Sequence, residues 1–321
     1  MQLVIDTKGK DWNIKMELFQ KIVKRIILAV FSLFVIVTIT FFLMNLIPGD
    51  PFMSEKANAE AQAILRAKYG LDQPVIVQYG RYLSNLFQGD MGNSYVLQKG
   101  RAIREIVTES FAVSMQLGIR ALCTAIFVGI PFGCIAGLWK DKKPDGVIRV
   151  ISAIGISVPG YVVAAILMLI LGVQLKLFPI SYNKPGGSIM PIITLALYPT
   201  CYLIRLTRAS ILEVLNQDYL RTERAKGMSE FVVIFIHALK NSLIPIITYL
   251  GPLTASVLTG GFVAESVFNV PGLGRYFVSA ISSRDYTLIM GTTIFYAALI
   301  ITMNLVCDIL YQIVDPRIKM D

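Results

Sequence analysis

The chain has 321 residues, of which 55% are hydrophobic and only 16% are charged. Soluble domains carry about 25% charged residues, so this composition excludes an ordinary soluble protein and indicates a membrane protein with several spans. The formal net charge of +9 does not indicate nucleic-acid binding, because membrane proteins collect lysine and arginine on their cytoplasmic loops. The four cysteines lie in apolar segments without a CxxC pair, which argues against a disulfide framework or a zinc site.

Six apolar segments have roughly the 20 residues that a helix needs to cross a bilayer. They are Ile22–Ile47, Phe111–Leu138, Ile148–Gly172, Ile189–Ile204, Leu243–Ala264 and Leu288–Val314. The first is too long for the apolar part of a signal peptide and lacks a small-residue cleavage site, so it is interpreted as a retained anchor. The fourth contains two prolines and is expected to continue as a helix towards Val214. The fold class is therefore an all-α membrane protein with six transmembrane helices.

Basic residues gather on one side of this six-span arrangement. They precede the first span, flank the loop between spans two and three, flank the segment between spans four and five, and follow span six. The positive-inside rule therefore predicts that both termini of this multi-pass protein lie in the cytoplasm. Residues 1–18 are interpreted as a cytoplasmic N-terminal extension, and residues 19–321 as a single transmembrane domain.

The segment 48–110, on the opposite side of the membrane, is too long for a simple connection. Its pattern predicts a helix over Ala57–Lys68, stopped by Gly70, and a second helix over Gln78–Phe87. Two interpretations stay open. The segment is either an ordinary surface excursion or a small cap that contacts an external partner.

A polar segment between spans four and five, residues 213–242, is the most informative part of the chain. Asn216 or Asp218 is expected to cap a short helix, because their side-chain oxygens accept hydrogen bonds from free N–H groups. Gly227 is expected to end that helix in a left-handed conformation, and Ser229 to cap a second helix. A rigid hairpin of helices suits a docking element better than a flexible connection.

This hairpin resembles the coupling-loop signature of membrane subunits of bacterial ABC importers, in the form found in peptide and nickel permeases. The stretch Asp218–Gly227 has this pattern with Glu223 where the usual form has alanine, and His237–Pro245 is similar as well. Further landmarks follow in order at residues 46–51, 69–74, 89–94, 155–159, 270–274, 284–286 and 315–317. The match is closest to the B-type membrane subunit of oligopeptide permeases.

The resemblance implies an ABC type I importer permease of the bacterial plasma membrane, which carries oligopeptides and forms half of the translocation pathway. The implied partners are a second homologous permease subunit, two cytoplasmic ATPases, an extracellular peptide-binding protein, the peptide and the lipid bilayer, without nucleic acid. ATP and Mg²⁺ would bind to the ATPases, and no cofactor or metal to this chain. The sequence agrees, because it has no GxxxxGK[ST] phosphate loop and no catalytic motif, so the chain is not expected to be an enzyme.

The expected ATPase-coupling residues lie in the hairpin, and the basic ones could pair with acidic residues of an ATPase. They are Asp218, Tyr219, Leu220, Arg221, Thr222, Arg224, Ala225, Lys226 and Gly227. The surface expected to enter a partner's cleft comprises Tyr219, Leu220, Thr222, Ala225 and Gly227. The alternative is a solvated basic loop near anionic lipid headgroups.

The candidates for a gate or pathway lie in spans two and five and in a sharp turn beyond span five. They are Arg120, Glu265, Phe268, Pro271, Gly272, Gly274 and Tyr276. Charges inside a membrane usually face a cavity or a partner. The alternatives are a structural ion pair or a contact with the second subunit for Arg120, interfacial solvation for Glu265, and a capped turn for residues 269–276.

Other functions stay open as alternatives. The same architecture could import dipeptides, nickel chelates or another small solute. A proton- or sodium-coupled secondary transporter would need intramembrane carboxylates, which are nearly absent from these spans. A channel or scaffold would not need the hairpin.

Overall fold

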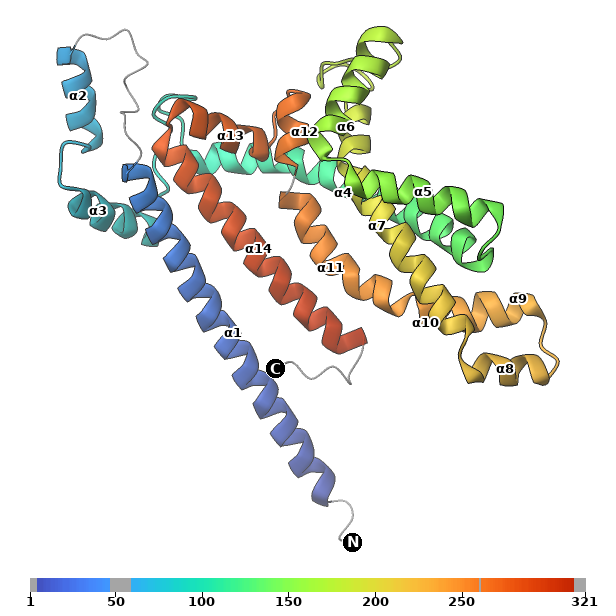
Figure 1. The fold of residues 1–321 in the computed structure, drawn as a ribbon. Coiled ribbons are helices and arrows are strands. Elements are labelled where there is room, and N and C mark those ends of the chain that lie inside the picture. The colour runs from blue at the N-terminus through green and yellow to red at the C-terminus, as the bar shows by residue number, and fades with distance from the viewer. Residues whose placement is uncertain (1–4, 47–58, 260, 315–321) are drawn as a thin grey trace.

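The computed structural model describes residues 5–46, 59–259 and 261–314, which form helices and loops without a β-strand (Figure 1). The N-terminal half contains α1 (Ile5–Leu46), α2 (Ala59–Tyr69), α3 (Val75–Phe87), α4 (Ile103–Leu138), α5 (Lys143–Ser157), α6 (Gly160–Leu167) and the π-helix η1 (Met168–Gln174). The C-terminal half contains α7 (Ile189–Leu215), α8 (Asp218–Ala225), α9 (Glu230–Val232), the π-helix η2 (Val233–Ala238), α10 (Leu239–Ser242), α11 (Ile244–Thr259), α12 (Phe262–Val267), α13 (Leu273–Ser283) and α14 (Tyr286–Val314).

Five stretches of helix among the described residues have the length and apolarity to cross a membrane. They are Val23–Leu46, Ile103–Leu138, Ile189–Leu215, Ile244–Val267 and Tyr286–Cys307. The helix pair Lys143–Ser157 and Gly160–Gln174 makes a sixth if it is counted as one span. The predicted all-α membrane fold is therefore confirmed. The second and sixth helices begin earlier than predicted, at Ile103 and Tyr286.

The predicted third span, Ile148–Gly172, is wrong as a single straight helix, because its two halves meet at 104°. Pro159 has no N–H to continue the hydrogen-bond ladder of α5, and its ring disfavours helical backbone at the residue before it. Val158 accordingly has extended backbone angles, φ −83° and ψ 123°. The span is therefore an elbow between α5 and α6 (Figure 1).

Helices α4 and α7 form the centre of the molecule, and small residues let them approach closely. A Cβ added to Gly129 would lie 2.8 Å from the Cβ of Leu203, and one added to Gly133 would lie 2.5 Å from the Cβ of Thr207. Gly137, one turn further along α4, meets α7 in the same way. Glycines four residues apart let backbones pack directly, which is how helices associate where lipid removes the hydrophobic driving force.

Residues 59–102, called the outer segment after the side of the membrane predicted for them, contact the spans at a buried carboxylate. Asp285, in the turn before α14, is fully buried and accepts hydrogen bonds from the hydroxyl of Ser94 (2.5 Å) and the N–H groups of Tyr95, Val96 and Leu97 (3.0–3.1 Å). The segment's predicted helices are confirmed as α2 and α3, while residues 47–58 lie outside the described part of the chain.

Candidate functional site

The polar hairpin between α7 and α11 has two helical arms, as the sequence predicts. Gly227 ends the first arm with a φ of +83°, and the Ser229 hydroxyl accepts a hydrogen bond from the N–H of Val232 at 3.5 Å. The predicted cap of α8 is wrong. Asn216 donates its side-chain amide to the carbonyl of Leu212, and Asp218 is already the first helical residue. A carboxylate there still favours the positive end of the helix dipole.

A small apolar core holds the two arms together. Leu220 and Val233 are completely buried, and Ala238 and Val214 pack with them. Leu220 was expected on the surface that enters a partner's cleft, and the structure corrects this, because a residue inside the hairpin cannot touch a partner. Leu220 lies on the inner face of α8, one turn before Arg224, and the composition of the segment did not predict which face of the helix is buried.

Polar bonds also join the arms to each other. The Arg224 guanidinium meets the Glu230 carboxylate at 2.8 and 3.5 Å, and the Asn241 amide donates to the Tyr219 hydroxyl at 2.7 Å. These contacts link the first arm to the beginning and the end of the second arm. The hairpin is therefore a preformed unit, although each exposed ion pair contributes only about 0–1 kcal/mol.

Three basic residues of the hairpin, at positions 221, 224 and 226, have carboxylates within it. Besides the pair formed by Arg224, Arg221 lies 3.5 Å from Asp218 and Lys226 lies 3.3 Å from Glu223. Thr222, Ala225 and Gly227 are exposed beside these pairs. Because surface pairs exchange partners at little cost in free energy, they do not prevent contact with acidic groups of another protein.

The second arm presents an apolar surface that sequence reasoning missed. Phe231, Phe235, Ile236 and Met228 are exposed by 66%, 50%, 55% and 40%, and the two phenyl rings stack with centroids 4.7 Å apart. An exposed apolar group of this kind marks an interaction surface. The spacing of four residues between the phenylalanines was the available signal, because such residues share one helix face.

The hairpin is joined to α7, and α7 is joined to α5. The Ser210 hydroxyl of α7 donates to the carbonyl of Ser242 in α10 at 2.8 Å. Two residues earlier in α7, Arg208 donates to both oxygens of the fully buried Asp145 carboxylate of α5 at 2.7 and 2.8 Å. Arg149 lies 3.6 Å from the same carboxylate. Movement of the hairpin would therefore reach α5 through hydrogen bonds, a connection between distant residues that sequence reasoning missed.

Among the gate candidates, Glu265 and the two glycines come together at one place. The Glu265 side chain is 2% exposed and accepts from the N–H groups of Gly274 (2.8 Å) and Arg275 (3.2 Å). The Ser114 hydroxyl of α4 accepts from the N–H of Leu273 at 2.8 Å. The two side chains thus satisfy the first free donors of α13. A side chain at Gly272 would clash with both Glu265 and Ser114.

The other gate candidates have separate surroundings. Phe268 is 1% exposed in a core with Leu117 and Met190, so it packs inside this chain. The Tyr276 hydroxyl accepts from Gln98 at 2.6 Å, and Pro271 is half-buried. Arg120 is exposed on α4, and its side chain has no hydrogen bond or ion pair with the described residues.

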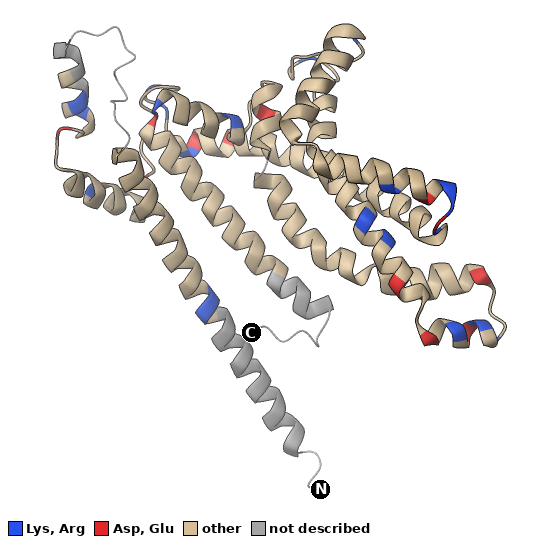
Figure 2. Cartoon of the chain, viewed as in Figure 1, with Lys and Arg blue, Asp and Glu red and all other residues tan. Residues whose placement is uncertain are grey.

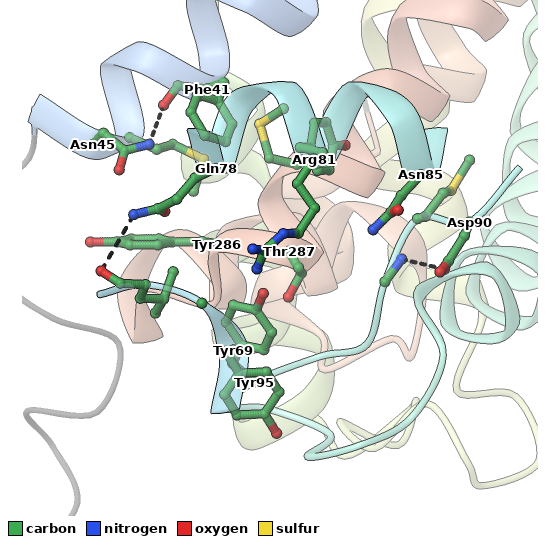
Figure 3. A pocket seen from close by; sticks show the side chains of 17 residues that line it. Phe41, Asn45, Tyr69, Gln78, Arg81, Asn85, Asp90, Tyr95, Tyr286 and Thr287 are labelled. Carbon is green, nitrogen blue, oxygen red and sulfur yellow. Dashed lines mark hydrogen bonds between the residues drawn. The ribbon is translucent and has the colours of Figure 1, made fainter. Parts of the chain in front are cut away.

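A cavity of about 150 Å³ lies between α1, α3, α14 and the outer segment. Figure 3 shows Arg81 and Asn85 of α3 pointing into it beside Tyr69 and Tyr95. Burial raises the pKa of the Tyr95 hydroxyl to about 12, so this group stays neutral at physiological pH. The cavity shows that the outer segment is packed on the spans with polar groups between them.

Helical spans with a stiff helical hairpin before the fifth span define the membrane subunit of a transporter. The family described as "binding-protein-dependent transport system inner membrane component" matches residues 129–320, and its N-terminal component matches residues 18–99. The chain belongs to this family.

The curated relatives are named as peptide permeases. The dipeptide transport system permease protein DppB of Bacillus subtilis is 43% identical over 90% of this chain and 94% of its own length. The oligopeptide transport system permease protein OppB of Haemophilus influenzae is 38% identical over 93% and 98%. These relatives are transport permeases rather than enzymes.

Two solved structures have a similar fold. The MetNI methionine ABC transporter has a TM-score of 0.53 and 12% identity, over 66% of this chain and 97% of that chain. An amino acid ABC transporter has a TM-score of 0.52 and 15% identity, over 65% and 94%. At such low identity the likeness concerns the fold alone, and the fold is that of an ABC importer permease.

Proposed function

We propose that this chain is a membrane subunit of an ATP-driven peptide importer and forms half of the translocation pathway. The observation that carries the proposal is the family membership, with peptide permeases as relatives along almost the whole chain. The second half of the pathway comes from a homologous permease subunit. A peptide-binding protein delivers the peptide from outside.

Two cytoplasmic ATPases dock on the coupling hairpins, one on each permease. ATP and Mg²⁺ bind in the ATPases, and this chain contributes no cofactor. The exposed Phe231 and Phe235 fit an apolar cleft, while Arg221, Arg224 and Lys226 meet acidic groups at its rim. Closure of the ATPases on ATP pulls the hairpins together and opens the pathway outwards, and hydrolysis resets it.

The hairpin and both termini face the cytoplasm in this proposal. Figure 2 supports this orientation, because lysine and arginine residues lie in the loop before α5, on the C-terminal half of α7 and on α8, although others lie on α2 and α3. Positive residues in short loops are retained on the cytoplasmic side. The outer segment with α2 and α3 then lies outside, where the peptide-binding protein arrives.

The proposal has two forms, which differ in the length of the peptide that is imported. The ordered sequence landmarks favour oligopeptides, and the oligopeptide permeases OppB of Haemophilus influenzae and Salmonella typhimurium align with this chain over 98% of their own length. The higher identities of 43% and 41% belong to dipeptide permeases, which favours dipeptides as the second candidate. Competition of labelled dipeptides, tripeptides and pentapeptides for uptake distinguishes the two.

The test is ATP-dependent uptake by the complex. The chain is pulled down from membranes, its partners are identified by mass spectrometry, and the complex is reconstituted in liposomes. The proposal expects a second permease, two ATPase copies and peptide uptake that stops without ATP. Peptide uptake by this chain alone, driven by a proton or sodium gradient, would replace it with a secondary transporter.

A further inference from the structure

The elbow between α5 and α6 exposes backbone polar groups inside a membrane-spanning segment. In a continuous helix the carbonyl of Gly155 would accept from residue 159, but Pro159 has no N–H. In a continuous helix the carbonyl of Ile156 would likewise accept from the N–H of Gly160. Gly160 instead begins α6 beyond the 104° bend, so this bond is lost as well. Non-helical backbone at membrane depth is tolerated only where protein buries it or where it lines a polar cavity.

Helix α5, which leads to the elbow, is shorter than the bilayer is thick. Helix α5 has 15 residues, which at 1.5 Å each place the elbow about 22 Å from the start of that helix. A hydrocarbon core is about 30 Å thick. Discontinuous helices at such depth are the usual place where transporters expose backbone groups to a substrate.

A cavity of about 250 Å³ opens at this elbow. It is lined by the turn itself and by one face of α7, namely by Gly155, Ile156, Ser157, Val158, Pro159, Gly160, Val163, Thr194, Leu197 and Tyr198. Thr194 is 8% exposed, and its hydroxyl has no hydrogen-bond partner among the described residues. A buried polar group without a partner calls for an explanation such as a ligand.

A row of tyrosines leads away from the cavity. The rings of Tyr198 and Tyr202 on α7 have centroids 6.3 Å apart, and Tyr202 stacks on Tyr249 of α11 at 4.3 Å. Tyr198 is 49% exposed beside the elbow. Tyrosine offers an apolar ring and a polar hydroxyl, so this row accommodates side chains of different character.

We propose that the elbow cavity binds the main chain of the peptide in transit, which rests on the proposed function as a peptide importer. The carbonyls of Gly155 and Ile156, which lose their α-helical partners at the bend, accept from peptide N–H groups, and the Thr194 hydroxyl donates to a peptide carbonyl. Recognition of the peptide main chain does not depend on the peptide's side chains. These side chains lie along the rings of Tyr198 and Tyr202. The cavity is smaller than the roughly 300–1,000 Å³ of complete ligand sites, so it holds a segment of the peptide.

The first test asks whether peptide reaches the elbow in the whole complex. The four natural cysteines are replaced, retained uptake is verified, and Ser157→Cys is introduced at the cavity. Phe87→Cys is the control, because Phe87 is 85% exposed outside the spans and does not line the cavity. A charged methanethiosulfonate reagent should modify Ser157→Cys, and a transported tripeptide should slow this reaction about fivefold or more without changing the control.

The two proposals fail in different ways. If tripeptide uptake is intact but Ser157→Cys either does not react or reacts equally with and without tripeptide, the elbow site is overturned and the importer stands. If the verified complex takes up no dipeptide, tripeptide or pentapeptide, the proposed function itself is overturned.

A second test separates a ligand contact from a structural role. Thr194→Val removes the unpartnered hydroxyl, whereas Thr200→Val removes a buried hydroxyl of the same helix that already donates to the carbonyl of Ala196 at 2.7 Å. Thr194→Val should raise the KM for tripeptide uptake several-fold with the ATPase rate of the complex unchanged, and Thr200→Val should not. Equal KM values for the two variants would overturn the role of Thr194.

Discussion

Single buried carboxylates decide much of the local structure of this protein. Glu265 holds the start of α13, Asp145 joins α5 to α7, and Asp285 holds the outer segment to the start of α14. Each is almost completely buried and accepts several hydrogen bonds. A buried charge is tolerated only when its hydrogen-bonding capacity is satisfied. These residues are therefore structural centres of this chain, whatever further role the gate candidates have.

Replacing Asp285 with alanine should destabilise the outer segment. The substitution leaves the N–H groups of Tyr95, Val96 and Leu97 without their acceptor, so we expect a loss of about 3 kcal/mol in the free energy of unfolding. The midpoint temperature of heat-induced aggregation of the purified complex measures this loss of stability. Asp72→Ala, at an exposed position of the same segment, is the control. Equal midpoints for the two variants would contradict this role.

Gly227 should be needed for coupling rather than for membrane insertion. Its φ of +83° disfavours any other residue, although no atom lies within 4 Å of an added Cβ. Gly227→Val should strain the turn by about 1–3 kcal/mol and reduce peptide uptake while the protein still inserts into the membrane. Gly146→Val is the matched control, since its surroundings are equally open and its φ is not positive. Uptake at the unsubstituted rate in the Gly227 variant would rule out the idea.

At the scale of elements, the hairpin is a stiff body with its own small core. The inward side chain of Leu220 and the bond between Asn241 and Tyr219 join its arms, and the bond between Ser210 and Ser242 fixes it to α7. The elbow of α5 and α6 lies against that same helix, since both line a cavity with Thr194 and Tyr198. Helix α7 therefore connects the surface proposed for the ATPase with the surface proposed for the peptide.

The exposed phenylalanines of the second arm should bind the ATPase. Replacing Phe231 and Phe235 together with serine removes the stacked apolar surface without touching the hairpin core. We expect at least tenfold less ATPase to copurify with the permease. Phe87→Ser is the control, because Phe87 is 85% exposed in the outer segment. Undiminished copurification would show that the hairpin docks by another face.

At the scale of the whole molecule, the apolar spans leave broad faces uncovered. Exposed residues such as Phe31 of α1, Phe127 of α4 and Ile151 of α5 face away from the core formed by α4 and α7. A bilayer covers part of such surface, and a second permease subunit is proposed to cover another part. The single chain is therefore expected to be a stable half of a larger pathway rather than a closed channel.

Topology can be tested on the whole molecule in intact cells. Phe87→Cys lies in the outer segment and Lys142→Cys in the loop between α4 and α5, and both side chains are exposed. A membrane-impermeant thiol reagent should label Phe87→Cys in intact cells, and Lys142→Cys only after the cells are opened. Labelling of Lys142→Cys from outside would reverse the proposed orientation.

Much of the fold was predictable because its signals are local. Apolar length identified the spans, and the positive φ of Gly227 and the cap by Ser229 followed from residue type. The cap of α8 was predicted wrongly, because Asn216 donates back into α7 instead. The buried position of Leu220 and the apolar second arm were missed, since both depend on how one arm of the hairpin lies on the other.

By itself the sequence determined the class of protein, the place of the apolar helices and the place of the hairpin, because hydropathy, charge and turn residues act over a few neighbouring positions. Only the tertiary structure decided the bond between Asp145 and Arg208 and the cap of α13 by Ser114, which lies 159 residues before the N–H it accepts from. Such contacts join residues far apart in the chain, and packing alone brings them together.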